Sequence, residues 1–380
     1  MRIVADHNIP LVAQAFSDLG EVELMHGREI TADQLKDCQC LVIRTVTRVD
    51  ATLLDNTAVE FVATATIGTD HVDKDYLNRA GIGFSNAPGC NAEGAAEYVV
   101  SGLFEMSRRR DFDPFALKAG IVGFGNVGSR LYAKLEALGI ECLLCDPPLQ
   151  QSGRSRHSFV DLDIILAECD FISLHVPLTH DGEHPTYHLL DENRLRRLVD
   201  GCVLINAARG EVIDNRALLE LLNDRSDLRM YLDTWENEPL VSRPLLQRVD
   251  LATPHIAGYS VEGRLRGTQM SLDAACAHFD TTQEWHMSRH LPPTRVIDCS
   301  EFGEGTEFWR DLLKCHCNIA VDHVAFVDGS ALDDAAFAAH FDGLRRIYPD
   351  RLEYDRFSLR VDASRQPVEQ LARLGFRLET

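Results

Sequence analysis

The sequence predicts an α/β protein with two doubly wound parallel-sheet domains around a cleft and a small C-terminal α/β domain. At 380 residues the chain is too long for one ordinary hydrophobic core. Short apolar runs alternate with helical patterns from residue 1 to about 290. Strands that alternate with helices are joined by crossovers, and such connections produce parallel sheets.

The first predicted domain comprises residues 1–92 and 258–288. Buried-strand runs at 40–44 and 59–64 alternate with helical patterns such as 11–19. Residues 260 to 290 are again helical in pattern, so the chain is expected to return to this domain after leaving it.

The second predicted domain comprises residues 93–257. It should begin with a long helix from Ala92 to Arg108, because apolar side chains recur there at helical spacing and arginines favour a helix C-terminus. A further helix is expected from Val127 to Leu138. Strands are expected at 118–122, 140–145, 170–175, 202–206 and 228–232.

The third predicted domain comprises residues 289–380, and Leu291-Pro292-Pro293 marks the region of the boundary. Its helical spacing at 337–347 and strand-like run at 357–361 indicate a packed module without evident chemistry. The sequence leaves open whether this module pairs two chains or covers one of the other domains.

Composition narrows the possible partners and location. A formal charge of −21 repels polyanions, so nucleic acid is not an expected partner, and an anionic substrate must meet local arginines. No stretch is long and apolar enough to cross a bilayer. Eleven cysteines in so long a chain indicate a reducing compartment, and we expect the cytoplasm. The pairs Cys142/Cys145 and Cys315/Cys317 lack the second pair of a metal site.

A glycine motif predicts the binding of a dinucleotide, NAD. Gly123, Gly125 and Gly128 follow an apolar strand and open a helix, where they allow a tight turn and bring backbone amides close to a pyrophosphate. Asp146 ends the next predicted strand, where its carboxylate can accept hydrogen bonds from an adenosine ribose and repel a 2′-phosphate. The alternative is a structural turn with a solvated aspartate.

Three side chains in loops after the later strands have the chemistry needed to oxidise a hydroxy acid. Arg209 follows the strand at 202–206, and its guanidinium can bind both oxygens of a carboxylate in a bidentate pair. His255 can take a hydroxyl proton, and Glu238 can orient the imidazole and stabilise its protonated form. Alone, each residue is more often structural, but their position downstream of a dinucleotide motif favours a shared site.

These motifs resemble those of the D-isomer-specific 2-hydroxyacid dehydrogenase family over residues 1 to about 290. The segments 175–189 and 65–71, Tyr259 and the C-terminal extension resemble the branch that oxidises a four-carbon phosphorylated acid in vitamin B6 biosynthesis. This resemblance implies catalysis by Arg209, Glu238 and His255, and a homodimer formed through the C-terminal domain. It also implies further contacts with NAD by Asn126, Val127, Asp146, His175, Ala207, Ala208, Asp233 and Gly258.

For the substrate, a small phosphorylated 2-hydroxy acid, the resemblance implies contacts with Thr45, Thr66 and Tyr259. Backbone amides near Ile67 and Gly68 are expected to help hold its carboxylate. Arg44 ends an apolar strand next to Thr45, and we predict that it binds phosphate.

Two other functions remain open at this stage. One is a dehydrogenase of 3-phosphoglycerate, which would share the fold and an anionic substrate. The other is an NAD-responsive interaction protein, such as a corepressor, in which the C-terminal domain recruits partners.

Overall fold

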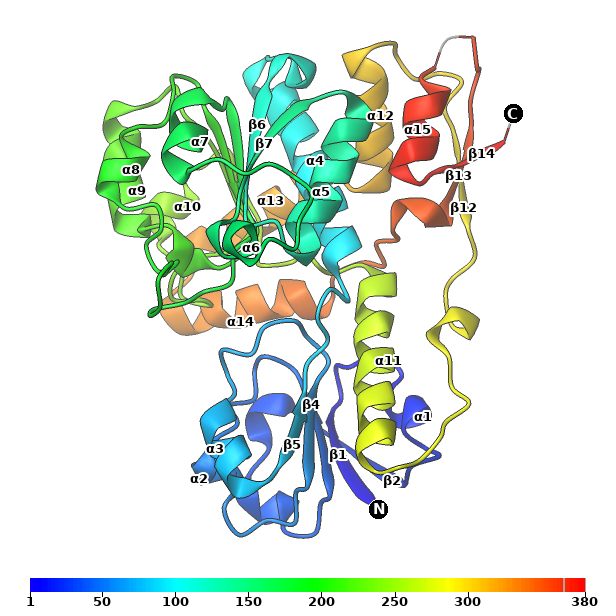
Figure 1. Ribbon diagram of the computed structural model, residues 1–380. Helices are drawn as coiled ribbons and strands as arrows, with labels where there is room; N and C mark the ends of the chain where they lie inside the picture. Colours follow the sequence, from blue (N-terminus) through cyan, green and yellow to red (C-terminus); the bar gives the residue numbers. More distant parts are fainter. Residues whose placement is uncertain (365, 380) are drawn as a thin grey trace. The chain divides into compact units, whose positions relative to one another are not determined.

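The computed structural model describes residues 1–364 and 366–379, and it divides the chain into two compact units (Figure 1). The first unit is Met1–Asn91 with Ser260–Pro292, and the second is Ala92–Tyr259 with Pro293–Thr380. Each unit contains a parallel sheet flanked by helices, which confirms the predicted α/β class. Residues 293–380 fall within the second unit, and the three-domain division with its boundaries stays a prediction.

A five-stranded parallel sheet forms the core of the first unit, in the order β2-β1-β3-β4-β5. Its strands are β1 (Arg2–Asp6), β2 (Glu21–Met25), β3 (Cys40–Ile43), β4 (Phe61–Thr64) and β5 (Gly83–Ser85). Apolar side chains of α1 (Val12–Ala15) and α11 (Val261–His278) pack on one face. Those of α2 (Ala51–Leu54) and α3 (Lys74–Ala80) pack on the other, so the sheet is covered on both sides.

Two helices of the first unit are shorter than the sequence pattern suggested. The expected helix at 11–19 is α-helical only over Val12–Ala15, because Leu11 adopts a left-handed conformation and the chain turns at Phe16. The expected helix at 260–290 ends at His278, shortly before Asp280, which has a positive φ of 51°. Buried Phe16 and Trp285 produced the apolar spacing without being helical.

A six-stranded parallel sheet forms the core of the second unit, in the order β11-β10-β9-β8-β6-β7. Its strands are β6 (Lys118–Val122), β7 (Glu141–Cys145), β8 (Phe171–Leu174), β9 (Val203–Asn206), β10 (Arg229–Leu232) and β11 (Leu251–Ala252). Strand order reverses at β6, with β7 on one side and β8 on the other. In such sheets ligands bind beyond the carboxyl ends of the strands at this reversal.

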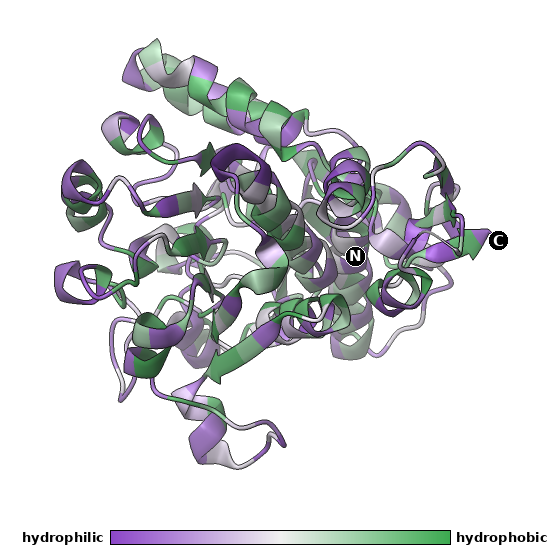
Figure 2. Ribbon diagram, turned by 90° about the horizontal axis from the view of Figure 1, so that it is seen from above, coloured by the Kyte–Doolittle hydropathy of each residue, from purple (hydrophilic) through white to green (hydrophobic). Residues whose placement is uncertain are grey.

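The helices of the second unit connect these strands. They are α4 (Ala92–Arg110), α5 (Asn126–Leu138), α6 (Pro147–Ser152), α7 (Leu162–Glu168), α8 (Glu192–Leu195), α9 (Asn215–Asp224) and α10 (Arg243–Leu246). Figure 2 shows hydrophobic and hydrophilic stretches alternating along the helices, as expected where one side of a helix packs on a sheet. No helix in the described residues is long and apolar enough to span a membrane.

The described residues of the segment 293–380 form a three-stranded parallel sheet, β12-β13-β14, and four α-helices. Their bounds are β12 (Arg295–Asp298), α12 (Thr306–His316), α13 (Ile319–Val327), α14 (Asp334–Arg346), β13 (Phe357–Arg360), α15 (Val368–Leu374) and β14 (Arg377–Glu379). Phe326 of α13 and Phe337 and Phe341 of α14 belong to the same buried cluster as Leu232 and Trp235. The C-terminal helices therefore share a hydrophobic core with the six-stranded sheet.

Short 3₁₀ helices complete the structure. They lie at Gly27–Glu29, Ala32–Leu35, Pro114–Ala116, Gly210–Val212, Met287–Arg289, Asp328–Ala331 and Tyr354–Arg356.

Candidate active site

The glycine turn between β6 and α5 is shaped to receive an anion. A Cβ on Gly123, which has a φ of +91°, would lie 2.6 Å from the His175 carbonyl oxygen, and one on Gly128 would lie 2.0 Å from the Gly123 oxygen. A Cβ on Gly125 would meet nothing within 4 Å. Gly125 precedes Asn126 and Val127 at the helix N-terminus and supplies no side-chain cap. The turn is thus open at Gly125 beside the start of α5, and a helix N-terminus with such a turn fits the pyrophosphate of NAD.

Asp146 joins this turn to the start of α6. One carboxylate oxygen accepts a hydrogen bond from the backbone N–H of Phe124 at 2.7 Å, and the other accepts one from Leu149 at 2.9 Å. Each carboxylate oxygen can accept a second hydrogen bond, so both remain able to bind a ribose hydroxyl. The sequence suggested the ribose contact but not the role of Asp146 in holding the turn.

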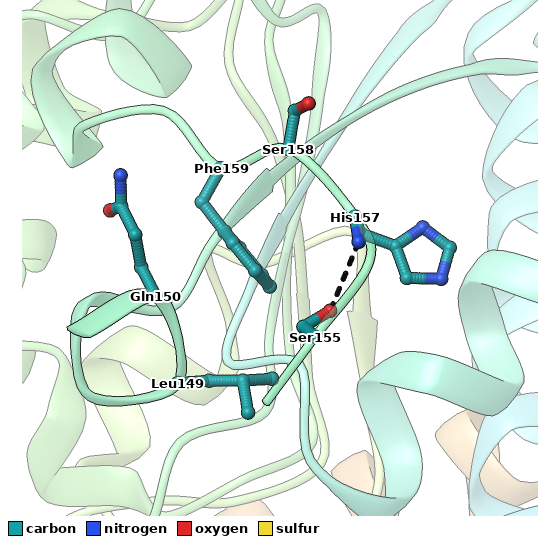
Figure 3. Close-up of a pocket in the computed structure, with 6 residues that line it drawn as sticks. All are labelled: Leu149, Gln150, Ser155, His157, Ser158 and Phe159. Carbon is teal, nitrogen blue, oxygen red and sulfur yellow. Dashed lines mark hydrogen bonds between the residues drawn. The ribbon is translucent and has the colours of Figure 1, made fainter. Parts of the chain in front are cut away.

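A hollow of about 290 Å³ lies between residues 155–159 and α6, the helix that Asp146 caps (Figure 3). It is lined by Leu149, Gln150, Ser155, His157, Ser158 and Phe159. The ring of Phe159 also packs 5.9 Å from Phe124 of the glycine turn. Leu149 and Phe159 offer apolar surface to a base, and the other lining side chains offer hydrogen-bonding groups, so the hollow suits the adenine end of the cofactor.

His175 lies directly after β8, against the glycine turn. Its Nε2 is 2.8 Å from the Ser173 hydroxyl, and burial lowers the pKa of His175 to about 3, so the ring is neutral near pH 7. Its Nδ1 is closed off from solvent and has no hydrogen-bond partner among residues 1–364 and 366–379. A buried polar atom without a partner is rare in folded proteins, so this nitrogen fits a site in which a bound ligand supplies the missing hydrogen bond.

Arg209 is placed by Asn206, the last residue of β9. The Asn206 side-chain oxygen accepts from the Ala208 N–H at 3.1 Å, and its amide donates to the Arg209 carbonyl at 2.8 Å. The guanidinium also donates to the Ala208 carbonyl at 2.8 Å. These bonds fold Ala207 and Ala208 into a tight turn and fix the direction in which Arg209 leaves the sheet.

The loop that holds Arg209 lies directly against the loop after β10. A Cβ on Gly210 would lie 1.8 Å from the Trp235 carbonyl carbon, so only glycine permits this approach of the two backbones. The side-chain oxygen of Asn215 accepts a weak hydrogen bond from the Glu236 N–H at 3.3 Å, and the Glu236 carboxylate binds His188 Nε2 at 2.6 Å. This network, which was not predicted from the sequence, holds the two loops together.

Glu238 and His255 form a hydrogen-bonded pair. Glu238 Oε2 lies 2.8 Å from His255 Nδ1, and Glu238 Oε1 accepts from the Trp235 N–H at 2.9 Å. Burial raises the pKa of Glu238, but the His255 charge and hydrogen bond, the Arg345 charge and the Trp235 amide outweigh it, so the pKa is lowered. Glu238 is therefore ionised at neutral pH and can stabilise a protonated imidazole.

Asp233 holds the turn that carries His255. Its buried carboxylate accepts from the Thr253 hydroxyl at 2.6 Å and from the N–H groups of Ile256 and Ala257 at 2.9 and 3.0 Å. Burial is the largest influence and raises the pKa of Asp233 despite these bonds. His255 itself has a positive φ of 56°, an unusual conformation for a non-glycine residue that these bonds sustain. Gly258 and Tyr259 follow directly.

Arg209, Glu238 and His255 thus leave the carboxyl ends of β9, β10 and β11, which are neighbours in the sheet. The glycine turn lies at the same edge, after β6. The second unit therefore assembles the predicted arginine, carboxylate, imidazole and dinucleotide turn along one edge of one sheet.

The other predicted substrate residues lie in the first unit. Arg44 and Thr45 follow β3, and Thr66, Ile67 and Gly68 follow the adjacent strand β4. The Thr66 hydroxyl is 2.8 Å from that of Thr64, while the Ile67 carbonyl accepts from Asn86 at 2.7 Å. Arg44 Nε is paired at 3.0 Å with the buried carboxylate of Asp6, a partner that the sequence analysis did not anticipate.

Comparison with known proteins identifies the family. Residues 91–257 match the model of the D-isomer specific 2-hydroxyacid dehydrogenase NAD-binding domain. Erythronate-4-phosphate dehydrogenase of Azotobacter vinelandii is 44% identical over 375 residues, covering 98% of each chain, and that of Chromohalobacter salexigens is 41% identical over 100% of this chain and 99% of its own.

Solved structures show the same fold. NAD⁺-bound 3-phosphoglycerate dehydrogenase of Entamoeba histolytica superposes with a TM-score of 0.64 at 22% identity, covering 75% of this chain and 99% of its own. D-lactate dehydrogenase of Aquifex aeolicus superposes with a TM-score of 0.61 at 24% identity, covering 74% of this chain and 96% of its own.

The chain belongs to the D-isomer specific 2-hydroxyacid dehydrogenase family, an NAD-dependent class of oxidoreductase. Within that family, its curated relatives at 40–44% identity over nearly their whole length carry the name erythronate-4-phosphate dehydrogenase.

Proposed function

We propose that this chain oxidises 4-phospho-D-erythronate at C2 to 2-oxo-3-hydroxy-4-phosphobutanoate with NAD, a step of pyridoxal 5′-phosphate biosynthesis. The relatives above support the substrate. The observation that carries the chemistry is the 2.8 Å pair between Glu238 and His255 on the loops next to Arg209. The alternatives, oxidation of 3-phosphoglycerate and a corepressor without turnover, have no comparable support among these relatives.

In this reaction Arg209 binds the C1 carboxylate, and its planar guanidinium can hold both oxygens. His255 takes the proton of the C2 hydroxyl at Nε2, the nitrogen that does not face Glu238. The ionised Glu238 then stabilises the positive imidazole. In the reverse reaction the same proton returns from His255 to the oxygen of the 2-oxo acid.

The residues that would hold NAD are those around the glycine turn and along the same sheet edge. They are Gly123, Gly125, Asn126, Val127, Gly128, Asp146, His175, Ala207, Ala208, Asp233 and Gly258. When bound, NAD supplies the acceptor for the hydride that leaves C2.

For the remainder of the substrate we propose contacts in the first unit and at Tyr259. Thr45 and Thr66 offer hydroxyl groups, and the amides of Ile67 and Gly68 can donate to the carboxylate. Arg44 supplies the positive charge for the phosphate, supported by its position after β3 beside Thr45.

The test is reduction of NAD by the purified protein with one acid at a time. We expect a kcat/KM for 4-phospho-D-erythronate at least tenfold above those for 3-phosphoglycerate and D-lactate. A preference for 3-phosphoglycerate would replace the proposed substrate. Turnover of none of these acids would contradict the proposal.

We further propose a homodimer formed through residues 293–380, in the cytoplasm. Val321 and Val324 are exposed one turn apart on α13, and this pair of apolar side chains supports a protein interface; Val296, Leu332 and Ile347 of the same segment are exposed as well. All eleven cysteines are free thiols, consistent with a reducing compartment. Light scattering across a dilution series should give the mass of two chains. A monomer at micromolar concentration would instead favour the alternative, in which this segment covers another domain of the same chain.

A further inference from the structure

The C-terminal helices support the loops that carry the candidate catalytic residues. Phe326 of α13 packs edge-on against Trp235 at 5.9 Å, and Trp235 in turn donates to the Thr253 carbonyl at 2.9 Å. His323, also on α13, accepts a hydrogen bond from the Ala252 N–H of β11 at 3.1 Å. The turn that presents His255 therefore rests on residues about 70 positions later in the chain.

An arginine of this segment also holds the turn after His255. The buried Arg351 donates to the carbonyls of Ile256 and Ala257, and its guanidinium lies 4.5 Å from the Tyr98 ring centroid. Both carbonyls belong to the turn whose N–H groups bind Asp233. The turn is thus held by an anion on its amide side and a cation on its carbonyl side.

A second arginine, Arg345 at the end of α14, faces the site itself. Its guanidinium carbon lies 5.5 Å from the Tyr259 ring centroid, which is within the range of a cation–π contact. Its charge acts on the Glu238 carboxylate and contributes to lowering the pKa of that group. Arg345 Nε is closed off from solvent and has no hydrogen-bond partner in the described part of the chain.

The position of Arg345 is not explained by its helix alone. Basic residues at a helix C-terminus interact favourably with the helix dipole, and α14 ends with both Arg345 and Arg346. Arg346 is exposed and can serve that role in solvent. The guanidinium carbon of Arg345 instead lies 5.5 Å from the ring centroid of Tyr259 and 5.5 Å from that of Phe341.

We propose that Arg345 is a positioning residue of the active site, which holds the Tyr259 phenol in place beside the Glu238–His255 pair. Acid binding then depends on the C-terminal segment as well as on the six-stranded sheet. The inference rests on the proposed function, because it takes Tyr259 as a group that contacts the acid. Arg345 needs no contact with the substrate in this role.

The expected consequence is weaker binding of the acid without weaker binding of the cofactor. Loss of a cation–π contact typically weakens an interaction by about two- to thirtyfold. Arg345→Met keeps much of the length and apolar surface of the side chain but removes its charge and its donors. We expect the KM for the acid to rise by roughly tenfold, with a smaller fall in kcat and an unchanged Kd for NADH.

Three further variants make this test specific. Arg346→Met is the matched control from the next, exposed position and should behave as the wild type. Tyr259→Phe should raise KM like Arg345→Met, and the double variant should be no worse than either, because each change prevents the Tyr259 hydroxyl from binding the acid. Arg345→Lys retains a charge and a donor and should recover part of the lost affinity.

The outcomes separate this inference from the proposed function. Calorimetric titration of the NADH-bound enzyme with the 2-deoxy analogue of the acid measures binding without turnover. If the wild type neither binds the analogue nor oxidises the acid, the proposed function fails. If the wild type does both and Arg345→Met matches it, or if the effects of the two single variants multiply in the double variant, the inference about Arg345 is overturned. A loss of NADH binding equal to the loss of acid binding would also overturn it, since that pattern indicates general destabilisation.

Discussion

Gly210 and Trp235 meet backbone to backbone: a Cβ on Gly210 would lie 1.8 Å from the Trp235 carbonyl carbon. Arg209 directly precedes this contact, and Glu238 lies three residues beyond it. The separation of the arginine from the carboxylate–imidazole pair is therefore set by a contact that tolerates no side chain. This makes Gly210 as important to the proposed chemistry as the residues that perform it.

Gly210→Ala should therefore separate the two loops. Inserting a methyl group into a packed contact costs about 1–3 kcal/mol of stability, and misplacing a catalytic group by about 1 Å can reduce the rate by about a hundredfold. We expect kcat/KM to fall at least that far in steady-state assays, with a lower urea midpoint. Gly343→Ala is the control, because a Cβ there would meet nothing within 4 Å; equal behaviour of the two variants would contradict this account.

His255→Asn should abolish proton transfer while leaving cofactor binding intact. Loss of a general acid or base typically lowers the rate by about 10²–10⁴-fold, and we expect kcat to fall within that range. NADH affinity, measured by fluorescence titration, should stay within about twofold of the wild type. A kcat near the wild-type value would remove His255 from the mechanism.

Glu238→Gln should have a smaller effect on kcat, because the amide can still contact His255 but cannot balance its positive charge. We expect a loss of about 10- to 100-fold in kcat, less than for His255→Asn. The depressed pKa of Glu238 means that its ionised form stabilises the folded state. That contribution to stability is fully present above pH 4.5, the ordinary pKa of a glutamate side chain. It is lost as the pH falls through the lower pKa that Glu238 has in the folded protein, so the urea midpoints of variant and wild type should converge in acid.

Much of the second unit follows from local sequence patterns. The strands from 118 to 232 are short apolar runs, and the glycine turn is a motif whose geometry is set by its own backbone, so both are readable without tertiary information. The position of His255 in a loop was also predicted, although the short strand β11 that precedes it was not. These are features in which neighbours in sequence are also neighbours in space.

What the sequence could not provide are contacts between distant segments. Arg351 binds the Ala257 carbonyl across 94 positions, and Arg44 pairs with Asp6 across 38. The sequence pattern from Phe337 to Ile347 does not distinguish Arg345 from its exposed neighbour Arg346, because either cation can interact with the dipole at the C-terminus of the same helix. Which of the two faces Tyr259 is decided by how α14 packs on the sheet.

Arg44→Met tests the phosphate contact in the first unit. We expect the KM for the phosphorylated acid to rise by at least about tenfold, as for loss of a charged hydrogen bond, with NADH affinity unchanged. Because Asp6 is fully buried and loses its partner, this variant should also have a lower melting temperature. Arg48→Met is the control, since Arg48 is exposed and pairs with Asp50. An unchanged KM for Arg44→Met would exclude the assignment.

His323 should make the C-terminal helices sensitive to acid. Burial, the largest influence, and the nearby charge of Arg109 lower the pKa of His323 to about 4, so the folded protein keeps this ring neutral where the unfolded chain binds a proton. A neutral ring is needed, because Nδ1 accepts the hydrogen bond from the Ala252 N–H. Its contribution to stability is therefore complete above about pH 6.5 and is lost as the pH falls towards 4.

His323→Asn offers an acceptor that does not titrate in this range, and it isolates the effect. We expect the variant to be less stable than the wild type by about 1 kcal/mol at pH 7.5, from imperfect packing, and the difference to shrink or reverse by pH 5. Urea denaturation at half-unit pH intervals measures it, with exposed His286→Asn as the control. Parallel curves for wild type and His323→Asn would show that protonation of this ring does not limit the attachment of α13 to β11.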